Sequence, residues 1–175
     1  MAVNFTGSYS QDFDTLASSG SSNAWTNDTT LSGWHLFRQP TPGTAITTYN
    51  AGDGNSNTGN FYSYGNSPDR ALGGLASGGT YFGSPASGAA AGWIAFAATN
   101  TTGATIDSLD VAFNGEQWRN GGNTTAQSMV LEYGFGTSFT TVSTWNTPGG
   151  NFNWTSPVAT STAAAVDGNT AGQVS

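Results

Sequence analysis

The amino-acid sequence predicts an all-β fold: a two-sheet antiparallel β-sandwich of the jelly-roll type, with long polar loops and little or no helix. Short runs rich in Val, Ile, Thr, Tyr, Phe and Trp are separated by clusters of Gly, Asn, Asp, Ser and Pro, which is typical of strands and turns. Helical periodicity is almost absent. Because aromatic residues make up 13% of the chain, we expect a core that is aromatic rather than aliphatic.

The expected strands follow from runs of β-forming residues and from alternation of apolar and polar positions. They lie at about 8–14, 33–39, 44–50, 60–65, 70–75, 92–99, 105–114, 127–135, 139–145 and 152–160. The alternation is clearest where Leu109, Val111 and Phe113 share one face, and it recurs in 127–135. An Asn-Gly-Gly-Asn turn at 120–123 predicts that these two strands form a hairpin. With 175 residues, no internal repeat and no linker, 1–175 is expected to be a single sandwich domain.

The charge balance excludes several classes of partner. Three Arg and no Lys stand against ten acidic residues, for a net charge of -7. Binding to nucleic acid depends on cations that neutralise phosphates, so we expect no nucleic-acid partner. No apolar run approaches the ~20 residues that span a bilayer, so no membrane insertion is expected. The absence of Cys excludes disulfides and thiolate chemistry.

Residues for catalysis are scarce, so we expect no enzyme. The only glutamates are Glu116 and Glu132. In the expected hairpin they lie about five positions apart along the ladder, roughly 16 Å at about 3.3 Å per residue, whereas glycoside hydrolysis needs about 5–10 Å. A polysaccharide-degrading enzyme that uses Glu116 or Glu132 is the less favoured alternative. The single histidine, His35, supplies neither a hydrolase triad nor a multi-His metal site.

One loop resembles a calcium-binding loop. Asp53, Asn55 and Asn57 place oxygen-bearing side chains at positions 1, 3 and 5, as calcium loops do. Position 12 is Tyr64 rather than Glu, so calcium is a candidate cofactor that would need further ligands. The same composition also suits a hairpin loop rich in residues that tolerate positive φ, and we favour that interpretation.

Aromatic residues in loops are candidates for ligand binding. An exposed indole can stack on the apolar face of a sugar, while neighbouring polar groups bind its hydroxyls. In a core poor in Leu and Ile, the same indoles are also needed for burial. We expect one of the four loop tryptophans to be a sugar platform, and nothing in the sequence selects it. The candidates are Trp25, Trp118, Trp145 and Trp154, with Glu116 and Arg119 beside Trp118.

Five short motifs in a fixed order resemble a known family. Gly-Glu-Gln-Trp-Arg at 115–119 is the most specific motif, and the others lie at 10–16, 33–34, 57–59 and 70–73. Together they are similar to a jelly-roll module of secreted bacterial multidomain proteins, which occurs beside extracellular nuclease-like domains, lamin-tail-like domains or cell-surface sorting tails. The opening Asp-Phe-Asp is also similar to that of concanavalin-like and adhesin-type sandwiches.

The resemblance implies a non-catalytic extracellular or cell-surface module that binds carbohydrate or attaches to a cell surface. The alternative is a structural subunit of a surface layer, filament or phage particle, which suits the low-charge, polar composition. The family pattern also implies a closing strand after Ser175. We therefore expect a sandwich without its final C-terminal strand, whose unpaired edge allows self-association with a second copy.

Overall fold

The computed structural model describes residues 2–38, 43–66, 68–76 and 92–175. Within these ranges every regular element is a β-strand or a 3-10 turn, which confirms the all-β class. The strands are β1 (Val3–Phe5), β2 (Asn23–Ala24), β3 (Trp34–Arg38), β4 (Thr44–Ala45), β5 (Thr48–Gly52), β6 (Asn60–Tyr64), β7 (Ala71–Leu75), β8 (Gly92–Phe96), β9 (Ala98–Asn100), β10 (Gly115–Glu116), β11 (Arg119–Asn120), β12 (Ser128–Met129), β13 (Trp154–Thr155), β14 (Ala164–Ala165) and β15 (Gln173–Val174). The 3-10 turns are η2 (Phe139–Thr141) and η3 (Gly150–Phe152).

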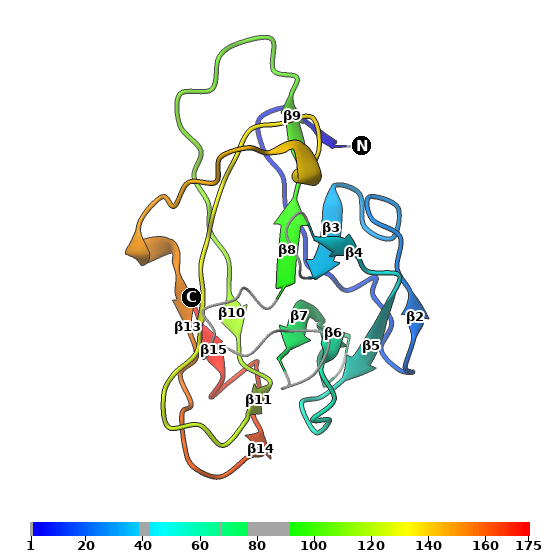
Figure 1. Ribbon diagram of the computed structural model, residues 1–175, viewed down its shortest axis with the longest axis vertical. Helices are drawn as coiled ribbons and strands as arrows, with labels where there is room; N and C mark the ends of the chain where they lie inside the picture. The colour runs from blue at the N-terminus through cyan, green and yellow to red at the C-terminus, as the bar shows by residue number, and fades with distance from the viewer. Residues whose placement is uncertain (1, 39–42, 67, 77–91) are drawn as a thin grey trace.

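Two sheets from the first hundred residues form the centre of the molecule (Figure 1). One has the order β4-β3-β8, and its longest ladder pairs Trp34 with Phe96 through Arg38 with Gly92. The other has the order β2-β5-β6-β7. In it β6 runs antiparallel to β7 and parallel to β5.

The main core lies between these two sheets. Leu36 from β3 is 0% exposed and Phe61 from β6 is 1% exposed, and Tyr49 from β5 packs in the same cluster. Loop residues complete this core, namely Leu16, Trp25, Leu31 and Ile46. Aromatic rings supply much of the packing that Leu and Ile supply in other proteins, as the composition predicts.

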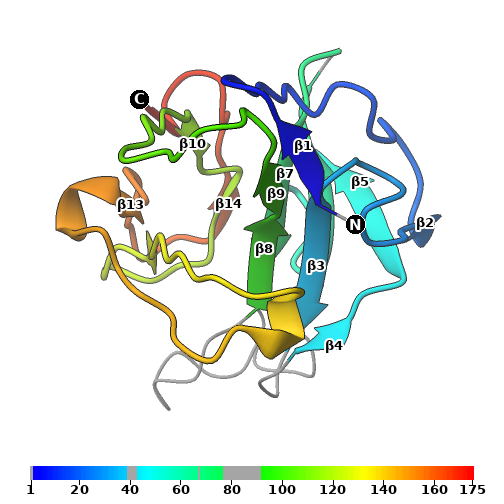
Figure 2. The same cartoon turned by 90° about the horizontal axis from the view of Figure 1, so that it is seen from above.

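A second, smaller core covers the opposite face of the β6 sheet. Side chains alternate along β6, so Tyr62 and Tyr64 point away from Phe61. Their rings stack with centroids 4.9 Å apart, and the ring of Trp118 lies parallel to Tyr64 at 6.2 Å. The C-terminal part of the chain thus packs on the sheet through Trp118. In Figure 2 the strands β10, β13 and β14 lie on one side of β8 and β9, and β1, β3 and β5 lie on the other.

The two-sheet antiparallel jelly roll is not confirmed. β5–β6 and β1–β9 are parallel pairs. After position 114 the described ladders are only two residues long, β10–β15, β11–β14 and β12–β13. The expected strands 33–39, 44–50, 60–65, 70–75 and 92–99 correspond to β3 to β9, although position 39 lies outside the described residues.

The expected hairpin of 105–114 and 127–135 is wrong. No residue of 105–114 belongs to a strand, and β12 pairs with β13 instead. The physical reason lies in Asn120, the first residue of the expected turn. Its side-chain amide is buried and donates to the carbonyls of Thr160 and Thr162, so this turn is tied to a later segment.

Two other expected strands are also replaced by local structure. In 8–14 the φ of Phe13 is 65°, and the side chains of Gln11 and Asp12 accept backbone N–H groups two residues on. Such short-range bonds close turns and compete with a ladder. In 139–145 the chain forms η2.

Candidate functional site

Two of the four loop tryptophans are buried and offer no ring face to a ligand. Trp25 is 2% exposed and its indole N–H donates to Asn27 Oδ1 at 2.6 Å. Trp118 is 3% exposed and donates to Glu116 Oε2 at 2.9 Å. Both rings serve the cores described above.

Trp154 is half-buried and packs against the backbone. A Cβ at Gly115 would lie only 1.8 Å from Trp154 Cδ1, so the missing side chain makes room for the indole. Trp145, at 37% exposed, is the most accessible of the four rings.

The Gly-Glu-Gln-Trp-Arg motif at 115–119 is a packing centre rather than an open site. Gln117 is buried and exchanges two hydrogen bonds of 2.8 Å with the backbone of Val158. Gly168 lies flat against the indole of Trp118, where a Cβ would be 2.3 Å from Cε2. Arg119 donates to the carbonyl oxygens of Gly54 and Asn55 at 2.9 and 3.1 Å. These contacts tie the C-terminal segment to the sheet and to the loop that follows β5.

That loop contains the expected calcium ligands. Both oxygens of Asp53 accept hydrogen bonds from Asn55, which lowers the pKa of Asp53. A positive charge already lies beside the carbonyls of this loop, because the guanidinium of Arg119 donates to those of Gly54 and Asn55. Asn57 instead lines a shallow hollow of about 230 Å³, with Leu75, Ala76, Arg119, Gly121 and Ala163. The described residues contain no group of three or more His, Cys, Asp or Glu that could hold a metal ion, so the calcium site stays a prediction.

The two glutamates have different environments. Glu116 is half-buried, and burial raises its pKa, partly opposed by the hydrogen bond from Trp118. Glu132 is exposed. Glu116 lies in β10, which pairs with β15, and Glu132 follows β12, which pairs with β13. The hairpin register from which their separation was predicted therefore does not exist.

The most prominent exposed aromatic surface lies elsewhere, where 133–136 meets 142–146. Tyr133 and Asn146 exchange two backbone hydrogen bonds of 2.8 Å. Gly134 allows this close approach, because a Cβ there would lie 2.4 Å from Val142 Cγ1. These two segments form a narrow ribbon with aromatic side chains on both faces, which we call the aromatic ribbon.

The aromatic ribbon is anchored to the β3–β8 sheet through Trp145 and through Phe139, which lies in η2 between the two segments of the ribbon. Phe139 from η2 stacks on Phe37 with ring centroids 4.2 Å apart, and its ring lies 5.9 Å from Trp93. The ring of Trp145 lies 5.3 Å from that of Phe139. His35 lies parallel to Phe37 at 6.1 Å, and burial lowers its pKa.

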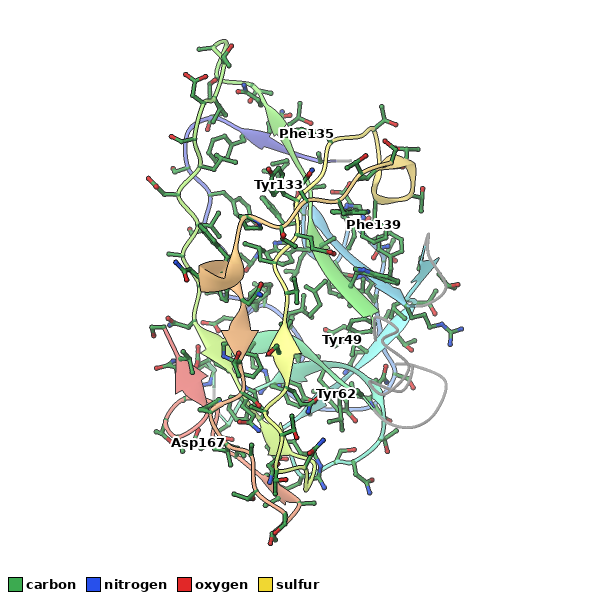
Figure 3. The ribbon with its side chains drawn as sticks, turned by 60° about the vertical axis from the view of Figure 1, so that its left-hand side comes forward. Tyr49, Tyr62, Tyr133, Phe135, Phe139 and Asp167 are labelled. Atoms are coloured by element: carbon green, nitrogen blue, oxygen red, sulfur yellow. The ribbon has the colours of Figure 1, made fainter. Side chains whose placement is uncertain are left out.

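The outer face of the aromatic ribbon presents Tyr133 and Phe135 to solvent (Figure 3). They are 49% and 85% exposed, and their rings meet edge to face at 6.2 Å and 83°. Asn146 pairs with Tyr133 across the bridge, so its exposed side chain lies on the same face. We call Tyr133, Phe135 and Asn146 the aromatic patch.

Sequence reasoning missed Tyr133 and Phe135 as surface residues. Their alternation with Met129 and Leu131 predicts one face of a strand, and such a face usually packs on a core. The two glycines that flank Phe135 are the signal that this segment is not an ordinary strand, because Gly is depleted in strands.

Comparison with known proteins returns no match to a protein-family model, a curated protein or a solved structure. Within the described ranges, no helix has the length and apolar character needed to cross a bilayer.

Proposed function

We propose that this chain is a non-catalytic extracellular binding module that recognises carbohydrate through the aromatic patch. The observation that carries the proposal is the exposure of Phe135 and Tyr133 on a ribbon that is itself anchored. Phe135 is 85% exposed and Tyr133 is 49% exposed. A ligand that covers these large side chains removes apolar surface from water, which favours binding. Sugar rings present an apolar face to such aromatic groups.

Polar groups beside the rings suit hydroxyl-rich ligands. The side chain of Asn146 makes no hydrogen bond to any residue that the structure describes, so both its donors and its acceptor are available. Thr144 and Thr147, next to Trp145 and Asn146, are exposed as well. A net charge of -7 disfavours acidic polysaccharides, so we propose a neutral glycan.

Because the aromatic ribbon is anchored to the β3–β8 sheet, ligand binding should cost the protein little conformational entropy. Phe139 is fixed by its stack on Phe37 and by its contact with Trp93, and the bridge at Tyr133 fixes the outer rings to the same ribbon. A preorganised surface keeps more of the interaction free energy as affinity. Trp145 acts as part of this anchor, with an edge at the surface.

The test is retention of the protein in gels that contain a series of neutral polysaccharides, for the wild type, Tyr133→Ala and Phe135→Ala. We expect retention on at least one neutral polysaccharide and a loss of about tenfold in affinity for each variant, equivalent to ~1.4 kcal/mol. Phe152→Ala is the matched control, because Phe152 is 36% exposed in η3, outside the patch. Equal loss in all three variants, or no retention of the wild type, would overturn the proposal.

For the fold, we propose that the two central sheets belong to a sandwich of the jelly-roll type. Support comes from the core that Leu36, Tyr49 and Phe61 form between them. The parallel β5–β6 pair departs from the antiparallel expectation. A crystal structure in which these two sheets lie face to face around this core would support the topology, and one without face-to-face sheets would contradict it.

A further inference from the structure

The segment 105–114 runs along the left-hand margin of the molecule above β10 in Figure 3. It has no hydrogen bond, backbone or side chain, to any residue that the structure describes. None of its residues has a positive φ. Leu109, Val111 and Phe113 are 63%, 50% and 48% exposed. A strand-forming sequence with unpaired N–H and C=O groups is a template for pairing with another chain.

We propose that 108–114 pairs antiparallel with the same segment of a second copy of this chain. In the register centred on Val111, each Val111 faces the other, and Leu109 of one copy faces Phe113 of its partner. All of these side chains lie on one face of the two-stranded ladder. Apolar and aromatic cross-strand pairs of this kind stabilise a ladder by roughly 0.2–1 kcal/mol each.

The positions of the Asp residues are compatible with this register and disfavour the register shifted by one residue. With Val111 at the centre, Asp110 faces Ala112, and Asp107 lies outside the ladder. A register shifted to centre on Asp110 would place two carboxylates directly opposite each other, which is destabilising. The two-fold symmetry closes the pair, because the same edge is used by both copies.

Two consequences follow for the strength of the dimer. A ladder of this length buries a small area, so the dimer is transient. Each copy carries a net charge of -7, and the two Asp110 side chains are diagonal neighbours. Salt screens such repulsion between exposed charges, so association strengthens as ionic strength rises.

Disulfide cross-linking of the full chain tests the register, because the protein has no cysteine of its own. Directly opposite residues in an antiparallel pair have Cα atoms about 4.5–5.5 Å apart, within the range that a disulfide spans. Val111→Cys should therefore give a covalent dimer on mild oxidation. In Leu109→Cys the two thiols are about 13 Å apart at ~3.3 Å per residue, and no dimer should form. Val130→Cys is the matched control, since Val130 is 57% exposed in another segment.

Sedimentation of the cysteine-free protein gives an independent measure of association. We expect the dimer fraction to increase with protein concentration and with salt, to increase further in Asp110→Asn, and to fall at least tenfold in Val111→Asp but not in Val130→Asp. A monomer at all concentrations and salt levels would overturn the proposal. Cross-linking of Leu109→Cys without Val111→Cys, or equal cross-linking of Val130→Cys, would also overturn it. Pairing with a strand of a different protein instead would leave the purified Val111→Cys protein monomeric on oxidation, which would likewise overturn the proposal.

Discussion

Arg70 illustrates how a chain with three cations uses one of them as a structural residue. It is 4% exposed, and its guanidinium donates to Ser63 Oγ, to the Ser63 carbonyl and to the Gly65 carbonyl. Burial lowers the pKa of Arg70, partly opposed by nearby Tyr49, Asp69 and Asp14. The hydrogen bonds of the guanidinium thus run to neutral oxygens near the end of β6.

Replacement of Arg70 should therefore be costly. Arg70→Met leaves three buried acceptors without their donors, and we expect a loss of about 3 kcal/mol in the free energy of unfolding. Arg119→Met, which removes a partly exposed guanidinium bound to two carbonyls, should lose about 1 kcal/mol. Urea denaturation of both variants measures the difference. Equal losses would contradict the structural role of Arg70.

The burial of Glu116 should make the free energy of unfolding depend on pH in a defined direction. Because burial raises its pKa above the ordinary 4.5, the folded state binds this proton more tightly than the unfolded state. The contribution of Glu116 to stability is thus present below pH 4.5 and is lost as pH rises through the folded pKa.

Glu116→Gln should remove this loss, because the Gln side-chain oxygen still accepts the indole N–H of Trp118. We expect the variant to gain stability relative to the wild type as pH rises above 4.5, measured by urea denaturation at a series of pH values. Glu132→Gln, at an exposed site, is the control. If the difference in the free energy of unfolding between wild type and Glu116→Gln does not change with pH, Glu116 has the same pKa in the folded and unfolded states, which would contradict this prediction.

At the scale of elements, β6 was predictable and 105–114 was not. All five residues of β6 are buried, and its three aromatic residues among four consecutive positions, between Gly and Asn clusters, indicate a strand covered on both faces. The apolar alternation of 105–114 is equally regular, yet no strand among the described residues pairs with it. Alternation of apolar and polar residues shows which face of a segment is apolar. Whether that segment pairs with another strand depends on residues distant in the sequence, such as those that bind Asn120.

Glycine at position 54 should be essential to the junction between the β5 loop and 115–119. Its φ is +89°, and a Cβ there would lie 1.7 Å from the carbonyl oxygen of Trp118. Gly54→Ala should cost at least 3 kcal/mol, of which backbone strain accounts for about 1. Gly103→Ala isolates the strain, because Gly103 has a φ of +79° and no atom within 4 Å. Thermal unfolding compares the two, and equal shifts in Tm would show that the contact with Trp118 is unimportant.

At the scale of the whole molecule, Trp118 joins the C-terminal segment to the central sheets. It lies between the ring of Tyr64 and the backbone of Gly168. Trp118 and its sequence neighbour Arg119 both take part in this junction, because the guanidinium of Arg119 donates to the carbonyls of Gly54 and Asn55. The parallel β5–β6 pair was not predictable, because turn signals and periodicity are the same for parallel and antiparallel neighbours.

Removal of the Trp118 ring should loosen this junction. We expect Trp118→Ala to lose 3–5 kcal/mol on the scale of other buried aromatic truncations. Amide hydrogen exchange should accelerate more in β10, β11, β14 and β15 than in β3 and β8. Uniform acceleration across all these strands would contradict a junction that holds the C-terminal segment alone.

The proposal that the aromatic patch binds neutral glycans is tested most directly by an NMR titration of the ¹⁵N-labelled protein with a neutral oligosaccharide. We expect the amide signals of 133–136 and 144–147 to shift with a common saturation curve, and the Phe135→Ala protein to show smaller shifts at the same concentrations. The buried indole signals of Trp25 and Trp118 should stay in place. Shifts centred on Asp53 and Arg119, or no shift for any neutral oligosaccharide that the polysaccharide gels select, would contradict it.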